Sequence, residues 1–310
     1  MNVIFMGTPE FAVPCLERLI EDGHHVSLVV TQADKPKGRG QKMMPPPVKE
    51  CALKHGIPVL QPASLKNEEV QETLRGHQPE LIVVVAYGKI LPRTVLEMPK
   101  HGCINVHATL LPRYRGAAPI QWAVLSGEVE SGVTTMYMDV GLDTGDMLLS
   151  DRCAIEPDLT AGELHDRLSV MGAEVLSKTL KALEKGELQR IPQNDAESCY
   201  APMLDKSLCP MDFTKTARQL HDQVRGLSPW PVATVVREGK RLKIHRTHVA
   251  DAVDAIPGQI VSAQPLIVAC GEGTALEICE VQAEGGKRMD AAAYFRGHPV
   301  AVGTAFTETD

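Results

Sequence analysis

The amino-acid sequence predicts two domains of different class: a doubly wound α/β domain with a mostly parallel sheet, then a small β-barrel. Short apolar runs alternate with amphipathic helical segments over the first half of the chain, which is typical of β-α-β units. One of these runs, residues 81–86, is continuously apolar and rich in valine, as expected of a parallel strand buried on both faces. Beyond residue 205, short apolar runs separated by turn residues indicate the barrel.

The elements of the first domain follow from hydrophobic periodicity and from helix-capping residues. Strands are predicted at residues 3–6, 26–30, 59–60, 81–86, 103–107 and 133–138, and helices at 11–20, 48–55, 67–75 and 91–97. Thr8 is predicted to be the N-cap of the first helix, with Pro9 at its first position. Thr160 and Glu163 fit a capping box, which predicts a long helix that ends at Gly186.

The second domain is predicted to follow a polar segment interrupted by prolines. We expect a catalytic domain at residues 1–189, a linker at 190–205 and a carboxy-terminal domain at 206–310. The carboxy-terminal domain is predicted to contain one helix, at residues 214–225. Its strands are expected at residues 233–237, 242–245, 258–261, 266–269 and 276–281.

The composition is that of an ordinary folded chain. The 310 residues include 44% hydrophobic and 23% charged residues, which excludes disordered and fibrous proteins. The formal net charge of −7 argues against a protein that coats nucleic acid over its whole surface, but it allows local basic patches. We expect a cytoplasmic location, because no apolar run could span a bilayer and the amino-terminal residues do not resemble a secretory signal.

Several motifs that would point to other chemistry are absent from the sequence. The eight cysteines form no CxxC pair, so we expect buried, reduced thiols and no bound metal. Residues 7–12, after the first predicted strand, read GTPEFA rather than GxGxxG, and no GxxxxGK[ST] motif occurs. The α/β pattern therefore gives little support to a dinucleotide-dependent dehydrogenase or a P-loop NTPase.

Basic residues gather in two segments against this acidic background. Residues 32–49 hold five Lys and Arg and one acid, and they follow the second predicted strand at the sheet edge where open α/β sheets bind ligands. Residues 206–250 hold nine Lys and Arg against three Asp and Glu. Both segments suit RNA phosphates; the alternatives are a disordered connector for the first and a solvated helix face for the second. The candidate contacts are Lys35, Lys37, Arg39, Lys42, Lys206, Lys215, Arg218 and Arg225, and the last three are predicted to share one helix face.

Three polar residues form a candidate acyl-transfer site. Asn105 and His107 are two residues apart at the end of a predicted strand, so their side chains point to the same face. Asp143 lies in the loop after the next predicted strand. An amide can stabilise an oxyanion, an imidazole can move a proton at neutral pH, and a carboxylate can orient the imidazole. The alternative for His107 is a structural histidine that caps the end of a strand.

Longer motifs around these residues resemble one known family. Residues 105–121, NVHATLLPRYRGAAPIQ, resemble the signature of the folate-dependent formyltransferases. The likeness extends to residues 5–11, 44–49, 138–147 and 229–231, which read FMGTPEF, MPPPVK, MDVGLDTGDM and PWP. The ending RGAAPIQ resembles the branch of this family that formylates initiator methionyl-tRNA.

The resemblance implies a fold and a set of site residues. The fold would be a Rossmann-like catalytic domain followed by an OB-like barrel that binds tRNA. The family's catalytic triad falls on Asn105, His107 and Asp143, and its tRNA-contacting loop falls on residues 32–49, with a loop arginine at Arg39. The implied folate contacts are Thr109, Leu110, Leu111, Pro112, Ala86, Tyr87, Gly88, Val140, Gly141 and Leu142.

The same resemblance implies the reaction. The formyl donor would be 10-formyltetrahydrofolate, and the acceptor would be the α-amino group of methionine on initiator tRNA. We expect no metal, no membrane partner and a monomer. The alternatives are a formyltransferase that acts on an amino sugar or a ribonucleotide amine, and a folate- or RNA-binding protein without catalysis. A sugar enzyme would not require the basic segment 32–49, and a non-catalytic protein would not require Asn105, His107 and Asp143 together.

Overall fold

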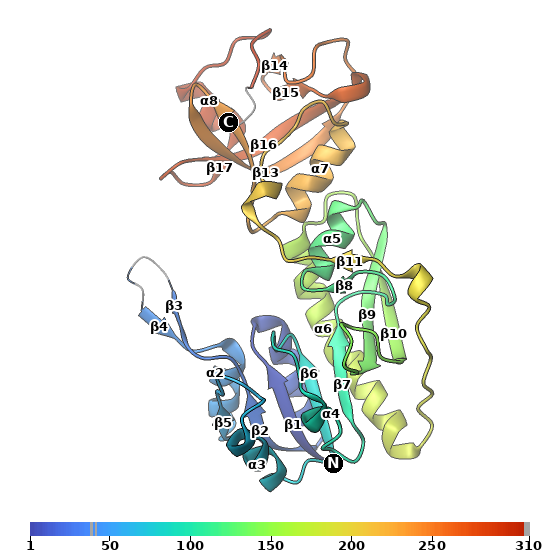
Figure 1. The fold of residues 1–310 in the computed structure, drawn as a ribbon. Coiled ribbons are helices and arrows are strands. Elements are labelled where there is room, and N and C mark those ends of the chain that lie inside the picture. Colours follow the sequence, from blue (N-terminus) through green and yellow to red (C-terminus); the bar gives the residue numbers. More distant parts are fainter. Residues whose placement is uncertain (38–39, 41, 307–310) are drawn as a thin grey trace. The chain divides into compact units, whose positions relative to one another are not determined.

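The computed structural model describes residues 1–37, 40 and 42–306, and its residues form two compact units (Figure 1). The first unit consists of Met1–Pro119, Glu130–Cys153 and His165–Pro202. The second consists of Ile120–Val129, Ala154–Leu164 and the chain from Met203 onwards. Two short segments that precede residue 165 thus belong to the second unit. The domain boundaries at residues 189 and 206 stay a prediction.

A seven-stranded sheet forms the centre of the first unit, in the order β10-β9-β7-β6-β1-β2-β5. The strands are β1 (Asn2–Gly7), β2 (His25–Val30), β5 (Val59–Leu60), β6 (Leu81–Val85), β7 (Cys103–His107), β9 (Glu130–Tyr137) and β10 (Met147–Ala154). The pairs β1–β2, β1–β6, β6–β7 and β2–β5 are parallel, whereas β9 pairs with β7 in the antiparallel direction. The doubly wound, mostly parallel sheet predicted from the sequence is confirmed.

Helices cover this sheet, and their ends follow local chemistry. They are η1 (Glu10–Ala12), α1 (Val13–Glu21), α2 (Pro47–Lys54), α3 (Glu68–Gly76), α4 (Arg93–Leu96) and α6 (Ala161–Lys185), whereas all of α5 (Pro119–Leu125) except Pro119 belongs to the second unit. The capping box of α6 is confirmed, because Glu163 N donates to Thr160 Oγ1 and Thr160 N donates to a Glu163 oxygen. The prediction of Thr8 as an N-cap is wrong: Pro9 occupies that position, and the Thr8 hydroxyl donates to the Tyr87 carbonyl instead.

Helix α6 is fixed to the sheet by a buried polar contact as well as by apolar packing. Thr179 Oγ1 lies 2.8 Å from Thr135 Oγ1 on β9, and both residues are fully buried. Gly172 lets the helix approach β7, since a Cβ there would lie 3.1 Å from a Val106 methyl carbon. The neighbours β7 and β9 are therefore held by the helix from one face, which fixes the strand that ends at His107.

The second unit is built on antiparallel strands, in the order β12-β13-β16-β15-β14 with β17 added to β16. Its strands are β12 (Ala233–Arg237), β13 (Lys240–Ala250), β14 (Ile260–Ala263), β15 (Leu266–Ala269), β16 (Ala275–Ala283) and β17 (Met289–Asp290). Its helices are η3 (Lys206–Leu208), α7 (Ala217–Gly226), η4 (Gly271–Gly273) and α8 (Ala291–Gly297). The architecture is consistent with an OB-like domain, but the described strands do not close into the predicted barrel.

Two further pairs of short strands matter for function. β3 (Lys35–Lys37) and β4 (Lys42–Met44) form an antiparallel hairpin within the basic segment, where the sequence predicted no regular structure. This β3–β4 hairpin extends away from the sheet of the first unit (Figure 1). β8 (Arg115–Gly116) pairs with β11 (Tyr200–Ala201) inside the same unit, after the short helix η2 (Asp195–Glu197). Among the described helices, none is long and apolar enough to cross a membrane.

A buried histidine in the second unit predicts a loss of stability in mild acid. Burial is the largest cause that lowers the pKa of His221, whose ring contacts Thr247 Oγ1 and the Pro157 carbonyl. The unfolded chain then binds a proton at higher pH than the folded one does. The free energy of unfolding is therefore at its full value above about pH 6.5 and falls as the pH drops through the folded pKa.

Urea unfolding between about pH 7.5 and about pH 5.5 measures this slope, because carboxylates still bind few protons there. The variant His221→Gln keeps a donor for the Pro157 carbonyl but cannot be protonated, so its slope is expected to be shallower than that of the wild type. His24 and His245, whose pKa values burial also lowers, account for the slope that remains. Equal slopes in the two proteins would contradict the assignment to His221.

Candidate active site

The end of strand β7 places two polar side chains on one face of the sheet. Asn105 and His107 alternate with Val106, and both are buried, at 9% and 5% exposure. Asn105 pairs with Val84 of β6 on one side and with Met136 of β9 on the other. This central position leaves little freedom to the backbone, so the two side chains are presented by a rigid element rather than by a loop.

The imidazole of His107 lies between two oxygen acceptors. Its Nε2 is 2.9 Å from the Tyr114 carbonyl, and since a carbonyl only accepts, Nε2–H is the donor. Its Nδ1 is 3.7 Å from Asp143 Oδ2. A doubly protonated ring could therefore donate toward an oxygen at each end.

The carboxylate of Asp143 is held from outside its own loop. The residue lies in the loop between β9 and β10, with a φ of 51°, in the left-handed region that L-residues other than Asn and Asp seldom adopt. The backbone N–H of Gly116 donates to Asp143 Oδ2 at 2.9 Å. Only glycine fits at residue 116, because φ is 124° and a Cβ would lie 2.6 Å from the Ala201 carbonyl. The structure therefore brings His107 and Asp143 together through a backbone amide of β8.

The side chain of Asn105 is available to a substrate. It makes no side-chain hydrogen bond to any residue within 1–37, 40 and 42–306, although its neighbours on the strand are fully enclosed. A nearly buried carboxamide without a protein partner is costly unless another molecule satisfies it. Its position, two residues before His107 on the same face, suits a donor to a carbonyl oxygen.

The three segments predicted to contact folate lie close to these residues in the fold. Ala86, Tyr87 and Gly88 follow β6, the direct neighbour of β7, with Ala86 and Gly88 exposed and Tyr87 buried. The segment 109–112 is fixed by Thr134, whose Oγ1 donates to the Thr109 carbonyl and accepts from Leu111 N. In the third segment, residues 140–142, the large apolar side chains of Val140 and Leu142 are 58% and 55% exposed.

These segments suit a flat, partly apolar ligand. Exposed apolar side chains beside a buried polar group are typical of sites for heteroaromatic rings. The Tyr87 backbone is held in place, because its carbonyl accepts from Thr8 Oγ1 and Gln32 Nε2. Burial raises the pKa of the Tyr87 phenol to about 12, and its buried hydroxyl has no hydrogen-bond partner within the described chain. Tyr87 is thus a core residue, and its phenol is not exposed to a ligand.

The predicted RNA contacts fall into three groups. Lys35 and Lys42 are exposed on the β3–β4 hairpin, Lys37 lies on β3, and Arg39 lies outside the described residues. The base of the hairpin is anchored, since Lys49 Nζ bonds both oxygens of Asp34 and the side chain of Gln61. Hydrogen bonds from Lys49 and Gln61 lower the pKa of Asp34, which keeps this anchor charged.

In the second unit the structure separates residues that the sequence grouped together. Lys206, Lys215 and Arg218 are exposed, as a contact surface requires. Arg225, however, is only 2% exposed, and its guanidinium donates to Asp222 Oδ1 at 2.7 Å and to the Leu159 carbonyl. The prediction that Lys215, Arg218 and Arg225 share one exposed face is wrong, because more than half of the circumference of α7 is buried. Arg225 is a structural residue in this geometry, and we leave it out of the RNA-binding surface.

Sequence comparisons decide the family of the chain. Two family models match, "Formyl transferase" over residues 1–180 and "Formyl transferase, C-terminal domain" over residues 203–299. Proteins named methionyl-tRNA formyltransferase are similar over nearly their whole length. The chain is 52% identical to the one from Trichlorobacter lovleyi, covering 98% of this chain and 96% of the relative. It is 53% identical to the one from Geobacter metallireducens, covering 96% of each.

The chain belongs to the formyl transferase family.

Two solved structures share the fold at low sequence identity. The N-formyltransferase from Helicobacter canadensis, in complex with folinic acid and dTDP-3-aminofucose, is 20% identical with a TM-score of 0.68, covering 89% of this chain and 98% of that one. HypX from Aquifex aeolicus, in complex with tetrahydrofolic acid, is 16% identical with a TM-score of 0.66, covering 100% of this chain and 51% of that one. These likenesses support the fold described above, including the sheet that contains β7.

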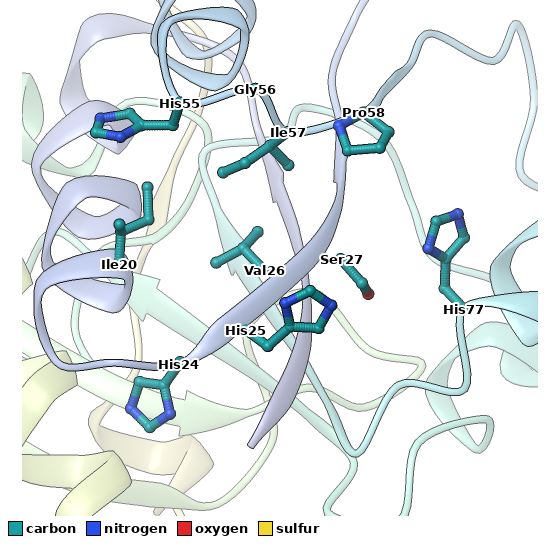
Figure 2. Close-up of a pocket in the computed structure, with 10 residues that line it drawn as sticks. All are labelled: Ile20, His24, His25, Val26, Ser27, His55, Gly56, Ile57, Pro58 and His77. Atoms are coloured by element: carbon teal, nitrogen blue, oxygen red, sulfur yellow. The ribbon is translucent and has the colours of Figure 1, made fainter.

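Other polar clusters in the first unit lie apart from β7. A pocket at the amino-terminal edge of β2 is lined by Ile20, His24, His25, Val26, Ser27, His55, Gly56, Ile57, Pro58 and His77 (Figure 2). Among the described residues one group could hold a metal ion by its spacing: Glu17, Cys51 and His55. Burial raises the pKa of the Cys51 thiol, which disfavours the thiolate that a metal needs. Neither cluster is part of the formyltransferase site.

Sequence reasoning missed the residues that hold the Asp143 loop. Gln193 lies in the predicted linker, yet its side chain donates to the carbonyls of Asp143 and Gly145. Arg115 lies within the family motif, but its contact with Gln193 joins segments 78 residues apart. No local periodicity or spacing marks such a contact, because it depends on how β8 and β11 pair.

Proposed function

We propose that this enzyme transfers the formyl group of 10-formyltetrahydrofolate to the α-amino group of methionine on initiator tRNA. The observation that carries the proposal is the identity of 50–53% over nearly the full chain to proteins named methionyl-tRNA formyltransferase. The arrangement of Asn105, His107 and Asp143 supports it, because acyl transfer to an amine needs an oxyanion donor and a mobile proton. The product is N-formylmethionyl-tRNA, which serves translation initiation.

The acceptor needs little activation. An α-amino group has a pKa near 8, so a large share of it is neutral and nucleophilic at cellular pH. Its attack on the formyl carbon forms a C–N bond and puts a negative charge on the formyl oxygen. The donor supplies a formyl carbon bound to a nitrogen that leaves as an amine. The protein therefore has to stabilise an oxyanion, protonate the leaving nitrogen and accept one proton from the attacking amine.

Each catalytic side chain takes one of these tasks. The free carboxamide of Asn105 donates to the formyl oxygen as it becomes negative. His107, in its protonated form, adds its positive charge near the oxyanion and gives a proton to the leaving nitrogen. Nε2 must release the Tyr114 carbonyl for this transfer, because that nitrogen donates to it in the structure. Asp143, whose Oδ2 lies 3.7 Å from Nδ1, orients the ring and helps to take up the proton of the amine.

The folate contacts are proposed from the same placement. Ala86, Gly88 and the backbone of Tyr87 would line one side of the ring system, and Val140, Gly141 and Leu142 the other. The segment Thr109, Leu110, Leu111 and Pro112 would form the turn beneath it. No step of the proposed mechanism needs a metal ion.

The RNA would be held by two basic surfaces. The first is the β3–β4 hairpin with Lys35, Lys37 and Lys42, together with Arg39, on the catalytic domain. The second is the group Lys206, Lys215 and Arg218. Phosphate contacts of this kind position RNA without reading its sequence. We also propose a monomer in the cytoplasm, with a catalytic domain at residues 1–189, a linker at 190–205 and a tRNA-binding domain at 206–310.

The acceptor can be tested directly. The purified protein with 10-formyltetrahydrofolate is expected to formylate methionyl-tRNA, whereas amino sugars linked to nucleotides and glycinamide ribonucleotide should stay unmodified, because they offer no RNA backbone to the basic surfaces. Formylation is followed by acid-gel mobility of the tRNA and by mass spectrometry of the small amines. Transfer to a sugar amine alone would overturn the proposed substrate.

The role of Asn105 predicts a loss of turnover without a loss of binding. Asn105→Ala removes the donor to the oxyanion, which costs about 2.7–4 kcal/mol of transition-state stabilisation, or a factor of about 10²–10³ in kcat. The dissociation constant for methionyl-tRNA should remain unchanged, because Asn105 is nearly buried and belongs to neither basic surface. Single-turnover kinetics and filter binding measure the two quantities. Normal turnover in the variant would exclude Asn105 from catalysis.

The basic hairpin predicts that affinity for tRNA depends on salt. Each phosphate neutralised by a lysine or arginine makes the slope of log Kobs against log salt more negative by about 0.7–0.9. Lys42→Ala is expected to remove about one phosphate contact and so to make the slope less steep by about 0.7–0.9. Lys66→Ala, at an exposed lysine outside both basic segments, should leave the slope unchanged. Titrations at four salt concentrations measure it, and a dissociation constant insensitive to salt would contradict the electrostatic model.

A further inference from the structure

The side chain of Gln193 lies between the two loops that build the active site. Its Nε2 donates to the carbonyl of Asp143 at 2.8 Å and to that of Gly145 at 2.7 Å. Both carbonyls belong to the loop between β9 and β10, so one amide holds that loop on both sides of Thr144. The loop carries the carboxylate that faces His107.

The other end of the same amide contacts β8. Gln193 Oε1 accepts from Arg115 Nε at 3.1 Å and from Arg115 Nη2 at 2.9 Å. The next residue, Gly116, donates its backbone N–H to Asp143 Oδ2. The two donors and two lone pairs of the amide are thus all used, and they connect the backbone of Asp143 to the strand that contacts its carboxylate.

The backbone around Gln193 is itself fixed at both ends. On one side, Ile191 forms a two-hydrogen-bond bridge with Met147 of β10. On the other side, β11 pairs with β8, in the register Tyr200 with Arg115 and Ala201 with Gly116. Residues 191–201 therefore run along the active-site loops as a clamp, although their sequence is that of a polar linker.

The clamp matters because Asp143 is in an unfavourable conformation. A φ of 51° lies in the left-handed region, which aspartate adopts more readily than most L-residues but which still costs free energy relative to ordinary backbone angles. The two hydrogen bonds from Gln193 hold the carbonyls of Asp143 and Gly145, and the hydrogen bond from Gly116 N holds the carboxylate of Asp143. Without the clamp, the loop is expected to relax toward ordinary backbone angles and to move the carboxylate away from His107.

We infer that Gln193 is a positioning residue for formyl transfer: it holds the Asp143 loop so that the carboxylate faces His107, and Arg115 aligns the amide. The role of His107 and Asp143 in turnover rests on the proposed function. The placement of the loop by Gln193 does not depend on which amine accepts the formyl group.

The decisive variant is Gln193→Glu. A glutamate keeps an oxygen for Arg115 but replaces both N–H donors with an oxygen that faces two carbonyls. We expect kcat to fall about 10- to 100-fold, because a small misplacement of a catalytic group lowers turnover by factors of this size. KM for the formyl donor and KM for the tRNA should stay within about twofold of wild type. Asn194→Ala is the matched control, since among the described residues that exposed side chain bonds to Ala196 and Glu197 alone, and its kcat should be unchanged.

A double-variant comparison separates positioning from general damage. If Gln193 acts through Asp143, then Gln193→Glu should lower kcat by less than about threefold when Asp143→Asn is already present. The same 10- to 100-fold loss in both backgrounds would overturn the inference, and so would an unchanged kcat in the single variant. If Gln193→Glu does not fold, Gln193→Met, which has a similar length and no hydrogen bonds, is measured in the same way.

A readout without substrate tests the placement by itself. The amide of Gly116 reports on the carboxylate of Asp143, so its hydrogen exchange, measured by NMR on the free protein, should accelerate in Gln193→Glu and not in Asn194→Ala. Unchanged exchange in Gln193→Glu would overturn the inference. If the wild-type protein failed to formylate methionyl-tRNA, the proposed function would fail while this exchange experiment would still decide the role of Gln193.

Discussion

A carboxylate on a strained loop has to face an imidazole on a rigid strand, and much of the first unit serves this contact. His107 is placed by β7, which lies between β6 and β9 and is covered by α6. Asp143 has no such support from regular structure, and its φ of 51° works against it. Backbone and side-chain hydrogen bonds from Gly116 and Gln193 supply the missing support. A site of this kind combines one rigid partner with one that is held by contacts from distant segments.

Charge is distributed in a way that suits an acidic enzyme with an RNA substrate. The chain carries a formal net charge of −7, yet exposed lysines gather on the β3–β4 hairpin, whose base is fixed by Lys49 and Asp34. In the second unit, β13 of the basic segment 206–250 pairs with β16. Arg246 of β13 lies opposite Glu280 of β16, whose carboxylate pairs with Arg288, and Arg225 is buried against Asp222. The surface left for phosphates is smaller than the sequence count implies.

The buried pair of Arg225 and Asp222 illustrates how burial reassigns a charged residue. A buried ion pair needs good geometry and further hydrogen bonds to offset the loss of hydration. Arg225 meets this condition through Asp222 and the Leu159 carbonyl, and Asp222 also accepts from Arg218. The same helix therefore carries one arginine that supports the core and another that remains at the surface.

The sequence by itself determined the features that depend on neighbours in the chain. Apolar runs predicted the parallel strands, Thr160 and Glu163 predicted the start of α6, and strand alternation placed Asn105 and His107 on one face. The family motif identified the residues worth examining. The tertiary structure alone decided the antiparallel direction of β9, the hairpin within the basic segment, the burial of Arg225 and the clamp formed by Gln193. These depend on contacts between segments far apart in sequence, and hydrophobic periodicity and capping patterns carry no information about such contacts.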